Sequence, residues 1–256
     1  MTWDPAQYLK FSDLRLRPAI DLLNRITVEN PSRVYDLGAG AGNVTRLLKA
    51  RWPKARIVGV DSSEEMLAKA RQVLPEVGWE LADLASWHPA VRADVIYSNA
   101  ALHWLGDHQR LLPRLFSALA ADGVLAIQMP DNFSSTSHLA VEEAVRSGPW
   151  RDRLEPLLRP NPVGSPEFYF DLLAPDALHL DIWQTEYLQV LEGKHPVKEW
   201  TKGTWLKPLL DAVKDPERSA FEQRYAELVA AAYPRRPDGR TLFPFRRLFI
   251  VAERRG

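Results

Sequence analysis

The sequence predicts an α/β fold with a mostly parallel sheet, and two observations lead to that class. Between Arg33 and Pro130, short apolar runs alternate with segments of helical periodicity, a rhythm typical of right-handed strand–helix–strand crossovers. The first apolar run leads directly into the glycine-rich turn DLGAGAG, residues 36–42. In open α/β sheets, ligands bind beside such turns, at the carboxyl ends of the strands.

The elements of this region follow from their apolar periodicity. The five expected strands are RVYDL (33–37), ARIVGVD (55–61), the weaker VGWELADL (77–84), ADVIYSNA (93–100) and GVLAIQMP (123–130). The three expected helices are NVTRLLKARW (43–52), SSEEMLAKARQVL (62–74) and HQRLLPRLFSALA (108–120). Asn43 is the expected N-cap of the first helix, and Ser62 or Ser63 that of the second. Asp122-Gly123 is expected to end the third helix.

The regular alternation of strand-like and helix-like segments ends after Pro130. Residues 131–180 are rich in proline and in helix-like pieces, so we expect a helical insert there. DIWQTEYLQVL (181–191) and the closing run 241–255 are expected to be strands that pair, at least one of them antiparallel. Between them we expect two or more helices, broken near Pro208 and Asp215-Pro216. The prediction is a single domain over residues 1–256, with a core at about 30–130 and 181–256 and cap helices from 131–180 and 197–233.

Composition narrows the functional classes. The 33 basic and 33 acidic residues cancel, which argues against a protein that grips nucleic acid through its overall charge. There is no cysteine, so thiolate chemistry and cysteine-based metal sites are excluded, and the six histidines lack metal-ligand spacing. No apolar run approaches the roughly 20 residues needed to cross a membrane, and the first residues do not resemble a signal peptide. We expect a cytoplasmic protein.

The residues around the glycine turn discriminate between its candidate ligands. A nucleoside-triphosphate loop requires Lys-Ser/Thr after its last glycine, but Asn43-Val44 follows Gly42 here. The dinucleotide fingerprint requires a glycine where Asn43 stands. What fits is an acid, one residue, and then G-x-G-x-G, starting at Asp36. A carboxylate beside the loop would repel a pyrophosphate but would favour a ligand with an ammonium group and a nearby sulfonium.

Polar side chains also stand at the ends of the following strands. Asp61 ends the second strand, where a carboxylate can accept both hydroxyls of a ribose. Asp83 ends the third and is suited to accept a hydrogen bond from an adenine amino group, beside the Leu84 N–H. Asn99 ends the fourth. Each acid by itself could be a helix cap or a solvated loop end, but together they predict one ligand site along the carboxyl edge of the sheet.

These motifs carry a family resemblance. DLGAGAG, VDSSEEML, ADL and SNAALHWL resemble the class I S-adenosylmethionine-dependent methyltransferases. WDPAQYLKF, RPAIDLL, QMPDN, KGTWLKP and DGRTLFPFRRLFIVA resemble, within that class, the trans-aconitate methyltransferases, so that the resemblance covers essentially the whole chain. It implies a Rossmann-like sheet of seven strands, the last antiparallel, with helices on both faces. Alanine inside the loop, where many members have Cys or Pro, is a small departure.

The resemblance also implies roles for individual residues toward S-adenosylmethionine, whose product is S-adenosylhomocysteine. Asp36, Gly38 and Gly40 would hold the methionine end. Asp61 and Ser62 would hold the ribose, Asp83 and Leu84 the adenine, and Asn99 and Ala100 would line the site. Two further candidates are Met66, whose helical spacing favours a core position, and His103, for which a contact is preferred to a role as base.

The implied reaction is the esterification of a carboxylate of trans-aconitate or a related small polycarboxylate. The acceptor has a pKa of about 4 and is ionised at neutral pH, so we predict no catalytic acid or base. Such an anionic substrate calls for cations, and arginine binds carboxylates best. The candidates for substrate binding are Tyr8, Arg17, Lys202, Trp205, Arg240 and Arg246. Arg246 and Arg247 point to opposite faces of a strand, so at most one of them is expected to face the pocket.

Two alternatives stay open at this point. A methyltransferase of the same fold could act on another small acid or on a hydroxyl acceptor, which an apolar pocket without converging arginines would favour. A binder without catalysis could keep the cofactor site. A nucleic-acid methyltransferase is disfavoured because SNAA stands where N/D-P-P-Y/F is expected. The expected partner is a small polycarboxylate, with no nucleic acid and no membrane; the oligomeric state is left undetermined.

Overall fold

The structure, a computed structural model, describes residues 12–256, with side chains described from residue 16. The chain forms two compact units. The sheet unit comprises Leu16–Pro130, Pro162–Thr185 and Arg247–Gly256. The helical unit comprises Asp131–Asn161 and Glu186–Arg246, together with residues 12–15.

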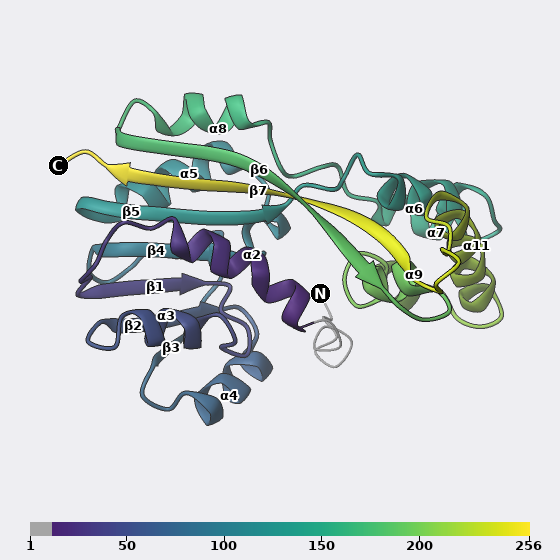
Figure 1. The fold of residues 1–256 in the computed structure, drawn as a ribbon, viewed down its shortest axis with the longest axis horizontal. Helices are drawn as coiled ribbons and strands as arrows, with labels where there is room; N and C mark the ends of the chain where they lie inside the picture. Colours follow the sequence, from purple (N-terminus) through teal and green to yellow (C-terminus); the bar gives the residue numbers. More distant parts are fainter. Residues whose placement is uncertain (1–11) are drawn as a thin grey trace. The chain divides into compact units, whose positions relative to one another are not determined.

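A seven-stranded sheet runs through the sheet unit in the order β3-β2-β1-β4-β5-β7-β6. Its strands are β1 (Arg33–Leu37), β2 (Arg56–Asp61), β3 (Gly78–Leu81), β4 (Ala93–Asn99), β5 (Leu119–Pro130), β6 (Ala177–Leu191) and β7 (Thr241–Arg254). The pairs among β1 to β5 are parallel, whereas β7 pairs antiparallel with β5. Figure 1 shows β6 running opposite to β7. The predicted fold class is confirmed.

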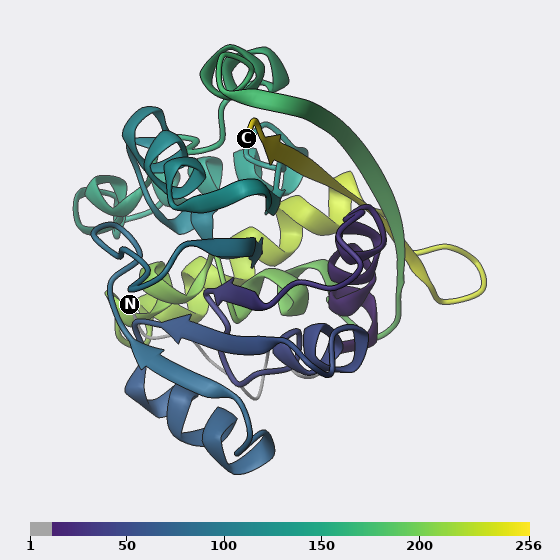
Figure 2. The ribbon, with the colours of Figure 1, turned by 90° about the vertical axis from the view of Figure 1, so that its left-hand side faces the viewer.

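Helices lie on both faces of this sheet (Figure 2). They are α2 (Ser12–Asn24), α3 (Thr45–Arg51), α4 (Glu64–Val73), the 3-10 turn η1 (Leu102–Trp104), α5 (His108–Ser117) and α8 (Pro166–Leu173). α4 begins as expected, because the Ser63 hydroxyl accepts a hydrogen bond from the Met66 N–H at 3.3 Å. The Tyr169 hydroxyl of α8 lies 2.7 Å from the Nδ1 atom of His108 on α5, so α8 packs within the sheet unit.

Two predictions about helix ends are wrong. The residue at the N-cap of α3 is Val44, not Asn43, and no side chain caps the helix. The glycine loop itself replaces the cap, because the Gly42 carbonyl accepts the Arg46 N–H at 3.0 Å. α5 ends at Ser117, earlier than expected, because the fully buried Leu119 already pairs with Ala93 in the sheet.

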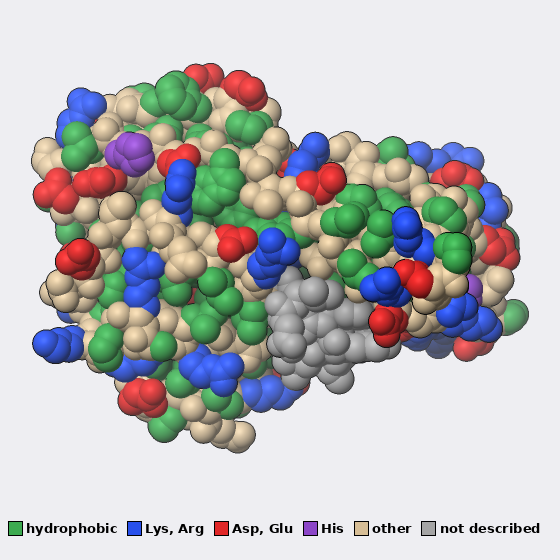
Figure 3. Space-filling model, in the orientation of Figure 1, with side chains coloured by type: hydrophobic (Ala, Val, Ile, Leu, Met, Phe, Trp, Pro, Cys, Tyr) green, Lys and Arg blue, Asp and Glu red, His purple; other side chains and the backbone are tan. Residues whose placement is uncertain are grey.

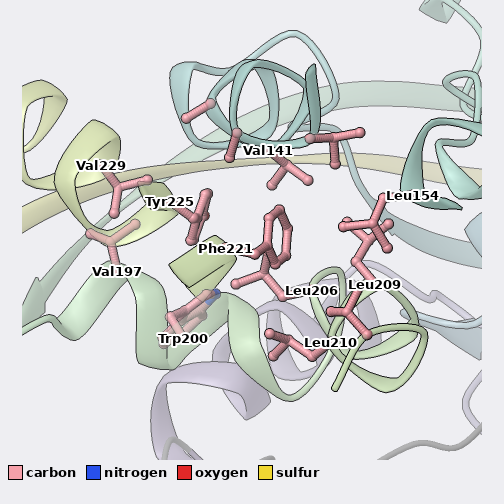
Figure 4. Close-up of a cluster of buried hydrophobic side chains, with 14 of the residues drawn as sticks. Val141, Leu154, Val197, Trp200, Leu206, Leu209, Leu210, Phe221, Tyr225 and Val229 are labelled. Carbon is pink, nitrogen blue, oxygen red and sulfur yellow. The ribbon is translucent and has the colours of Figure 1, made fainter. Parts of the chain in front are cut away.

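The helical unit packs its helices around an apolar core of its own (Figure 4). The helices are α6 (Thr136–Arg146), α7 (Arg151–Leu154), the 3-10 turn η2 (Glu155–Leu157), α9 (Pro196–Lys202), α10 (Lys207–Asp211) and α11 (Glu217–Ala232). α11 presents Phe221, Tyr225 and Val229, spaced four apart on one face, to this core. Each such buried side chain stabilises the fold by about 1.5–3 kcal/mol. The breaks expected near Pro208 and Pro216 are present.

β6 and β7 each contribute residues to both units. Residues 177–185 and 247–254 belong to the sheet unit, and residues 186–191 and 241–246 to the helical unit. The expectation of a single domain with a cap stays a prediction. On the face drawn in Figure 3, basic and acidic side chains are interspersed over each unit, in keeping with the zero net charge.

Among the residues the structure describes, no helix combines the length and the apolar character needed to cross a membrane.

Candidate active site

The glycine loop after β1 adopts a conformation that only glycine takes readily. Gly38, Gly40 and Gly42 have φ values of 78°, 55° and 84°. A Cβ atom on Gly38 would lie 2.1 Å from the Cβ atom of Ala101, the second residue after β4. Glycine at position 38 therefore permits both the left-handed backbone and the close packing of the loop against the end of β4. Among the described residues, a Cβ atom on Gly40 would meet only the Met66 Cε atom, at 3.5 Å.

Asp36, on β1 just before the loop, is a buried acid with 2% of its surface exposed. Its Oδ2 atom accepts a hydrogen bond of 2.6 Å from the Thr45 hydroxyl. Burial raises the pKa of Asp36 to about 7; the Thr45 hydrogen bond lowers it and the nearby Asp61 charge raises it further. Thr45 was not predicted from the sequence, although a hydroxyl in the first turn after the loop was the available signal. This acid would be fully ionised at neutral pH only with a cation beside it.

Asp61, the last residue of β2, forms a hydrogen bond that links the glycine loop to this strand. Its Oδ2 atom accepts the Gly40 N–H at 2.8 Å, and its Oδ1 atom accepts the Ser63 N–H at 2.9 Å. Each carboxylate oxygen has a second lone pair, so the side chain keeps acceptor capacity for a ligand. Ser62 beside it is exposed, and Met66 is buried in α4 with 6% exposure, as its helical spacing favours.

The loop after β3 is held in place from α5. Arg114 donates to the Leu84 carbonyl at 2.8 Å and to the Ala85 carbonyl at 2.6 Å. Asp83 is exposed, and its Oδ1 atom accepts the Ala85 N–H at 2.9 Å. Leu84 is buried, with its Cδ1 atom 3.9 Å from the position of a Cβ atom on Gly38. Leu84 therefore lies beside the glycine loop.

The chain after β4 combines strain with a buried polar atom. Ala100 has a φ of 54°, which costs about 1–3 kcal/mol for a residue other than glycine. Its N–H donates to the Gln128 carbonyl at 2.9 Å. The Asn99 Oδ1 atom is buried and has no hydrogen-bond partner among residues 12–256. His103 is 8% exposed, with its ring 4.7 Å from that of Trp104. Strain and unsatisfied polar atoms concentrate at ligand sites.

The structure thus gathers the predicted cofactor residues along the carboxyl edge of the sheet, because the glycine loop contacts the ends of β2 and β4 and the loop after β3. Among the residues described, no group of three or more histidine and acidic side chains could hold a metal ion.

The predicted substrate residues do not all belong to the same unit. Tyr8 lies outside the described residues, and Arg17 is exposed on α2 of the sheet unit. The other four belong to the helical unit, where each has a partner: Lys202 with Glu222 at 2.7 Å, Arg240 with Asp238 at 2.6 Å, Arg246 with Asp131 at 2.9 Å, and Trp205 with the rings of Phe133 and His138. The three cations of this group are engaged by carboxylates of their own unit.

Of the two adjacent arginines on β7, the structure buries the one that was not selected from the sequence. Arg247 is 5% exposed, whereas the Arg246 side chain is 43% exposed. The Nη1 atom of Arg247 lies 3.5 Å from the Oε1 atom of the fully buried Gln128 on β5. Alternation along the strand predicted that the two arginines face opposite ways but not which of them is buried.

Comparisons with known proteins extend these observations. Residues 34–123 match a family model described as a methyltransferase domain. The chain is 50% identical over 253 residues to trans-aconitate 2-methyltransferase from Azoarcus sp. (strain BH72), covering 99% of each chain. It is 46% identical to trans-aconitate 2-methyltransferase from Rhodopseudomonas palustris (strain BisB18), covering 98% of each.

Two solved structures share the fold. The YcgJ protein from Bacillus subtilis matches with a TM-score of 0.61 at 15% identity, covering 94% of this chain and 99% of that one. A phosphoethanolamine N-methyltransferase from Haemonchus contortus, in complex with S-adenosylhomocysteine, matches with a TM-score of 0.56 at 15% identity, covering 94% of this chain and 53% of that one. At these sequence identities, the structural similarity shows only that the fold is shared.

Proposed function

The chain belongs to the trans-aconitate 2-methyltransferase family, and we propose that it transfers a methyl group from S-adenosylmethionine to a carboxylate of trans-aconitate or a closely related small polycarboxylate. The observation that carries this proposal is the extent of the likeness, 50% identity over 99% of both chains. The product is a methyl ester. A cytoplasmic location and the absence of a nucleic-acid partner stay predictions.

The residues at the carboxyl edge of the sheet fit this cofactor chemically. The buried acid Asp36 suits an ammonium group, the positive-φ glycines leave the loop without side chains, and the buried Asn99 Oδ1 atom lacks a partner among the described residues. In the proposal, Asp36, Gly38 and Gly40 hold the methionine end, Asp61 and Ser62 the ribose, and Asp83 and Leu84 the adenine. Asn99, Ala100, Met66 and His103 line the remainder.

The protein's contribution to the reaction is mainly positioning. When bound, S-adenosylmethionine supplies a methyl group already activated by its sulfonium. The acceptor carboxylate is ionised at neutral pH, so no residue of the chain has to remove a proton. The side chains around the site hold the acceptor oxygen in line with the methyl group and exclude water. An ionised Asp36 compensates the charge of the bound ammonium.

Methyl transfer tests the proposal directly. Purified protein is incubated with S-adenosylmethionine carrying a labelled methyl group and with a panel of di- and tricarboxylates, and the methyl esters are identified by mass spectrometry. The highest kcat/KM is expected for trans-aconitate. No turnover on any acid of the panel would contradict the proposal, and turnover only on hydroxylated acceptors would replace it.

Asp61→Ala tests the cofactor site. Because hydrogen bonds to a charged group contribute about 1.5–3 kcal/mol, we expect the dissociation constant of S-adenosylmethionine to rise at least about tenfold. Calorimetry measures it, with Glu64→Ala as the control, since Glu64 is an exposed carboxylate that pairs with Arg71. Equal affinity in wild type and Asp61→Ala would remove the ribose role.

A further inference from the structure

The strand register brings several polar residues of the sheet unit to one face of the sheet. Residues that pair across adjacent strands project to the same side, as do residues two apart along a strand. Asp36 pairs with Tyr97, and Asn99 stands two residues further along β4. Asn99 pairs with Gln128, and Pro130, two residues after Gln128, pairs with Arg247. Asp36, Asn99, Gln128 and Arg247 therefore share a face.

The charge of these residues changes across the sheet. The acid stands on β1, the two uncharged amides stand on β4 and β5, and the arginine stands on β7. α2 contacts the same face, because the Tyr97 hydroxyl donates to the Ala19 carbonyl at 2.7 Å. Two ligands bound side by side, one with a positive group at β1 and the other with negative groups toward β7, match this order.

The amides on this face have hydrogen-bonding capacity that the described residues do not use. Gln128 is fully buried, and its Nε2 atom has no hydrogen-bond partner among residues 12–256. Leaving a buried donor unsatisfied lowers the stability of the fold. Its Oε1 atom meanwhile accepts from the Arg247 guanidinium, at 3.5 Å. The unused donor thus lies on a side chain that already contacts a buried cation.

The chemistry of this pair selects an anion with several acceptor oxygens. Arginine stays protonated and presents up to five N–H groups in a planar fork that matches a carboxylate. A carboxylate could accept from the guanidinium and from the Gln128 amide together, in charge-assisted hydrogen bonds. The neighbouring Arg246 is less suited, because its side chain is 43% exposed.

We propose that Gln128 and Arg247 form a subsite for one carboxylate of the acid substrate, on the sheet face that also carries Asp36 and Asn99. This inference rests on the proposed methyl transfer to a polycarboxylate. In it, Arg247 supplies the charge and Gln128 orients the carboxylate, so that a second carboxylate of the same molecule can be directed toward the cofactor. The subsite makes charge number a determinant of substrate choice.

Substitutions at Gln128 test the subsite while conserving its shape. Gln128→Glu places a carboxylate beside Arg247, an ion pair that favours folding, and this carboxylate would compete with the substrate. We expect the KM for trans-aconitate to rise about tenfold or more, with the calorimetric affinity for S-adenosylmethionine within about twofold of wild type. Gln128→Met removes the amide without adding charge and should raise KM less. An unchanged KM in Gln128→Glu would overturn the proposal and leave a structural water as the partner of the amide.

A second experiment couples Arg247 to one carboxylate of the substrate. Mesaconate, glutaconate and itaconate each lack a different one of the three carboxylates of trans-aconitate, and their inhibition constants are measured against labelled methyl transfer. In wild type, each loss of a carboxylate weakens binding. In Arg247→Gln, the loss of the carboxylate that occupies the subsite should no longer weaken binding. The one analogue that lacks this carboxylate should then bind as well as trans-aconitate does, whereas the other two still bind more weakly. Equal discrimination against all three in both proteins would overturn the proposal.

The control is Arg254→Gln, which removes the same charge from the same strand at a residue that donates to the Leu119 carbonyl at 2.7 Å. It should leave KM and the inhibition constants unchanged. Arg247→Lys, which keeps the charge but loses the fork, is expected to fall between wild type and Arg247→Gln. Wild-type protein that methylates no acid would contradict the proposed function, whereas active protein whose KM is insensitive to Gln128 and Arg247 would contradict the subsite alone.

Discussion

The two units use their polar side chains differently. In the helical unit, the Glu222 carboxylate accepts from Lys198 and Lys202, both at 2.7 Å, and the Thr201 hydroxyl donates to the Tyr225 hydroxyl at 3.1 Å. Within the described residues of that unit, no buried side-chain nitrogen or oxygen lacks a partner. In the sheet unit, the Asn99 Oδ1 and Gln128 Nε2 atoms are buried without one.

This difference supports the proposal that the buried polar atoms of the sheet unit bind a ligand. In an ion pair, each charge has an oppositely charged partner that offsets part of its desolvation cost. A buried atom without a partner lowers stability until something binds it. Three cations chosen from the sequence as substrate ligands, Lys202, Arg240 and Arg246, already pair with carboxylates of their own unit. The two buried amide atoms without a partner among the described residues stand in the sheet unit, at the strand ends near Asp36.

The largest expected effect comes from Gly38→Val in the sheet unit. The Cβ clash with Ala101 and the positive φ together should lower the free energy of unfolding by about 5 kcal/mol and abolish cofactor binding. Gly193→Val in the helical unit is the matched control, because Gly193 has a φ of 113° but no atom of the described residues meets its Cβ position within 4 Å. It should lose only the strain energy, about 1–3 kcal/mol. Denaturant unfolding and calorimetry measure both, and equal losses would contradict the close-packing role of Gly38.

Asp36 should make the sheet unit less stable as the pH rises. Its pKa is raised from 3.8 to about 7 by burial, so between these values the unfolded state has lost a proton that the folded state retains. The contribution of Asp36 is therefore fully present below about pH 4 and falls by about 1.4 kcal/mol per pH unit toward pH 7. Asp36→Asn should lack this slope, so that the difference in unfolding free energy between variant and wild type varies with pH over this range. The affinity for S-adenosylmethionine should rise with pH over the same range in wild type only, and parallel unfolding curves would refute the assignment.

His138 in the helical unit should show the opposite sign. Burial lowers the pKa of His138 from 6.5 to about 4, among the rings of Phe133 and Trp205. As the pH falls from 6.5 toward 4, His138 is protonated in the unfolded state but stays neutral in the folded state. The stability that neutral His138 contributes above pH 6.5 is therefore lost. His138→Gln should flatten this loss without altering cofactor affinity at pH 8. A stability difference between variant and wild type that does not vary with pH would contradict the shift.

Glu222→Gln tests whether the ion pairs of the helical unit are structural. The carboxylate is 18% exposed and holds two lysines, so its loss should cost about 1–2 kcal/mol after allowance for partial screening. Cofactor affinity should stay at the wild-type value. Glu227→Gln on the same helix is the control and should be neutral, because the Glu227 side chain is exposed and accepts a hydrogen bond from the uncharged Gln223 amide at 2.9 Å. A fall in cofactor affinity with unchanged stability would show that Glu222 serves the cofactor site and not the stability of the helical unit, which contradicts the prediction.

The smallest effect is expected from Arg240→Ala. The side chain is 51% exposed and already bonded to Asp238, so the thermal midpoint should not move measurably. Its selection from the sequence as a substrate ligand predicts a modest rise in the KM for trans-aconitate, with cofactor affinity unchanged. Steady-state kinetics decide it, and a wild-type KM would remove Arg240 from the substrate side.

The features that could be predicted from the sequence are periodic or local. The alternation of strands and helices predicted the fold class, and the glycines around Gly40 lie in the positive-φ turn that their spacing indicated. Ser63 caps its helix because a cap bonds to a backbone N–H three residues away. Asn43 failed as a cap because the loop carbonyl of Gly42 supplies the acceptor instead. The roles assigned to Asp61, Asp83 and Asn99 toward the cofactor stay predictions.

What only the tertiary structure decided depends on contacts between distant residues. The bond from Arg247 to Gln128 joins residues 119 apart in sequence, and the strand register that aligns them is set by packing over the whole sheet. The same packing buries Arg247 rather than Arg246 and raises the pKa of Asp36 through desolvation. The sequence by itself determined the strands, the loop and the acids at the strand ends, because these follow from short-range periodicity and backbone geometry. Which polar atoms remain buried without partners could emerge only when the strands were assembled.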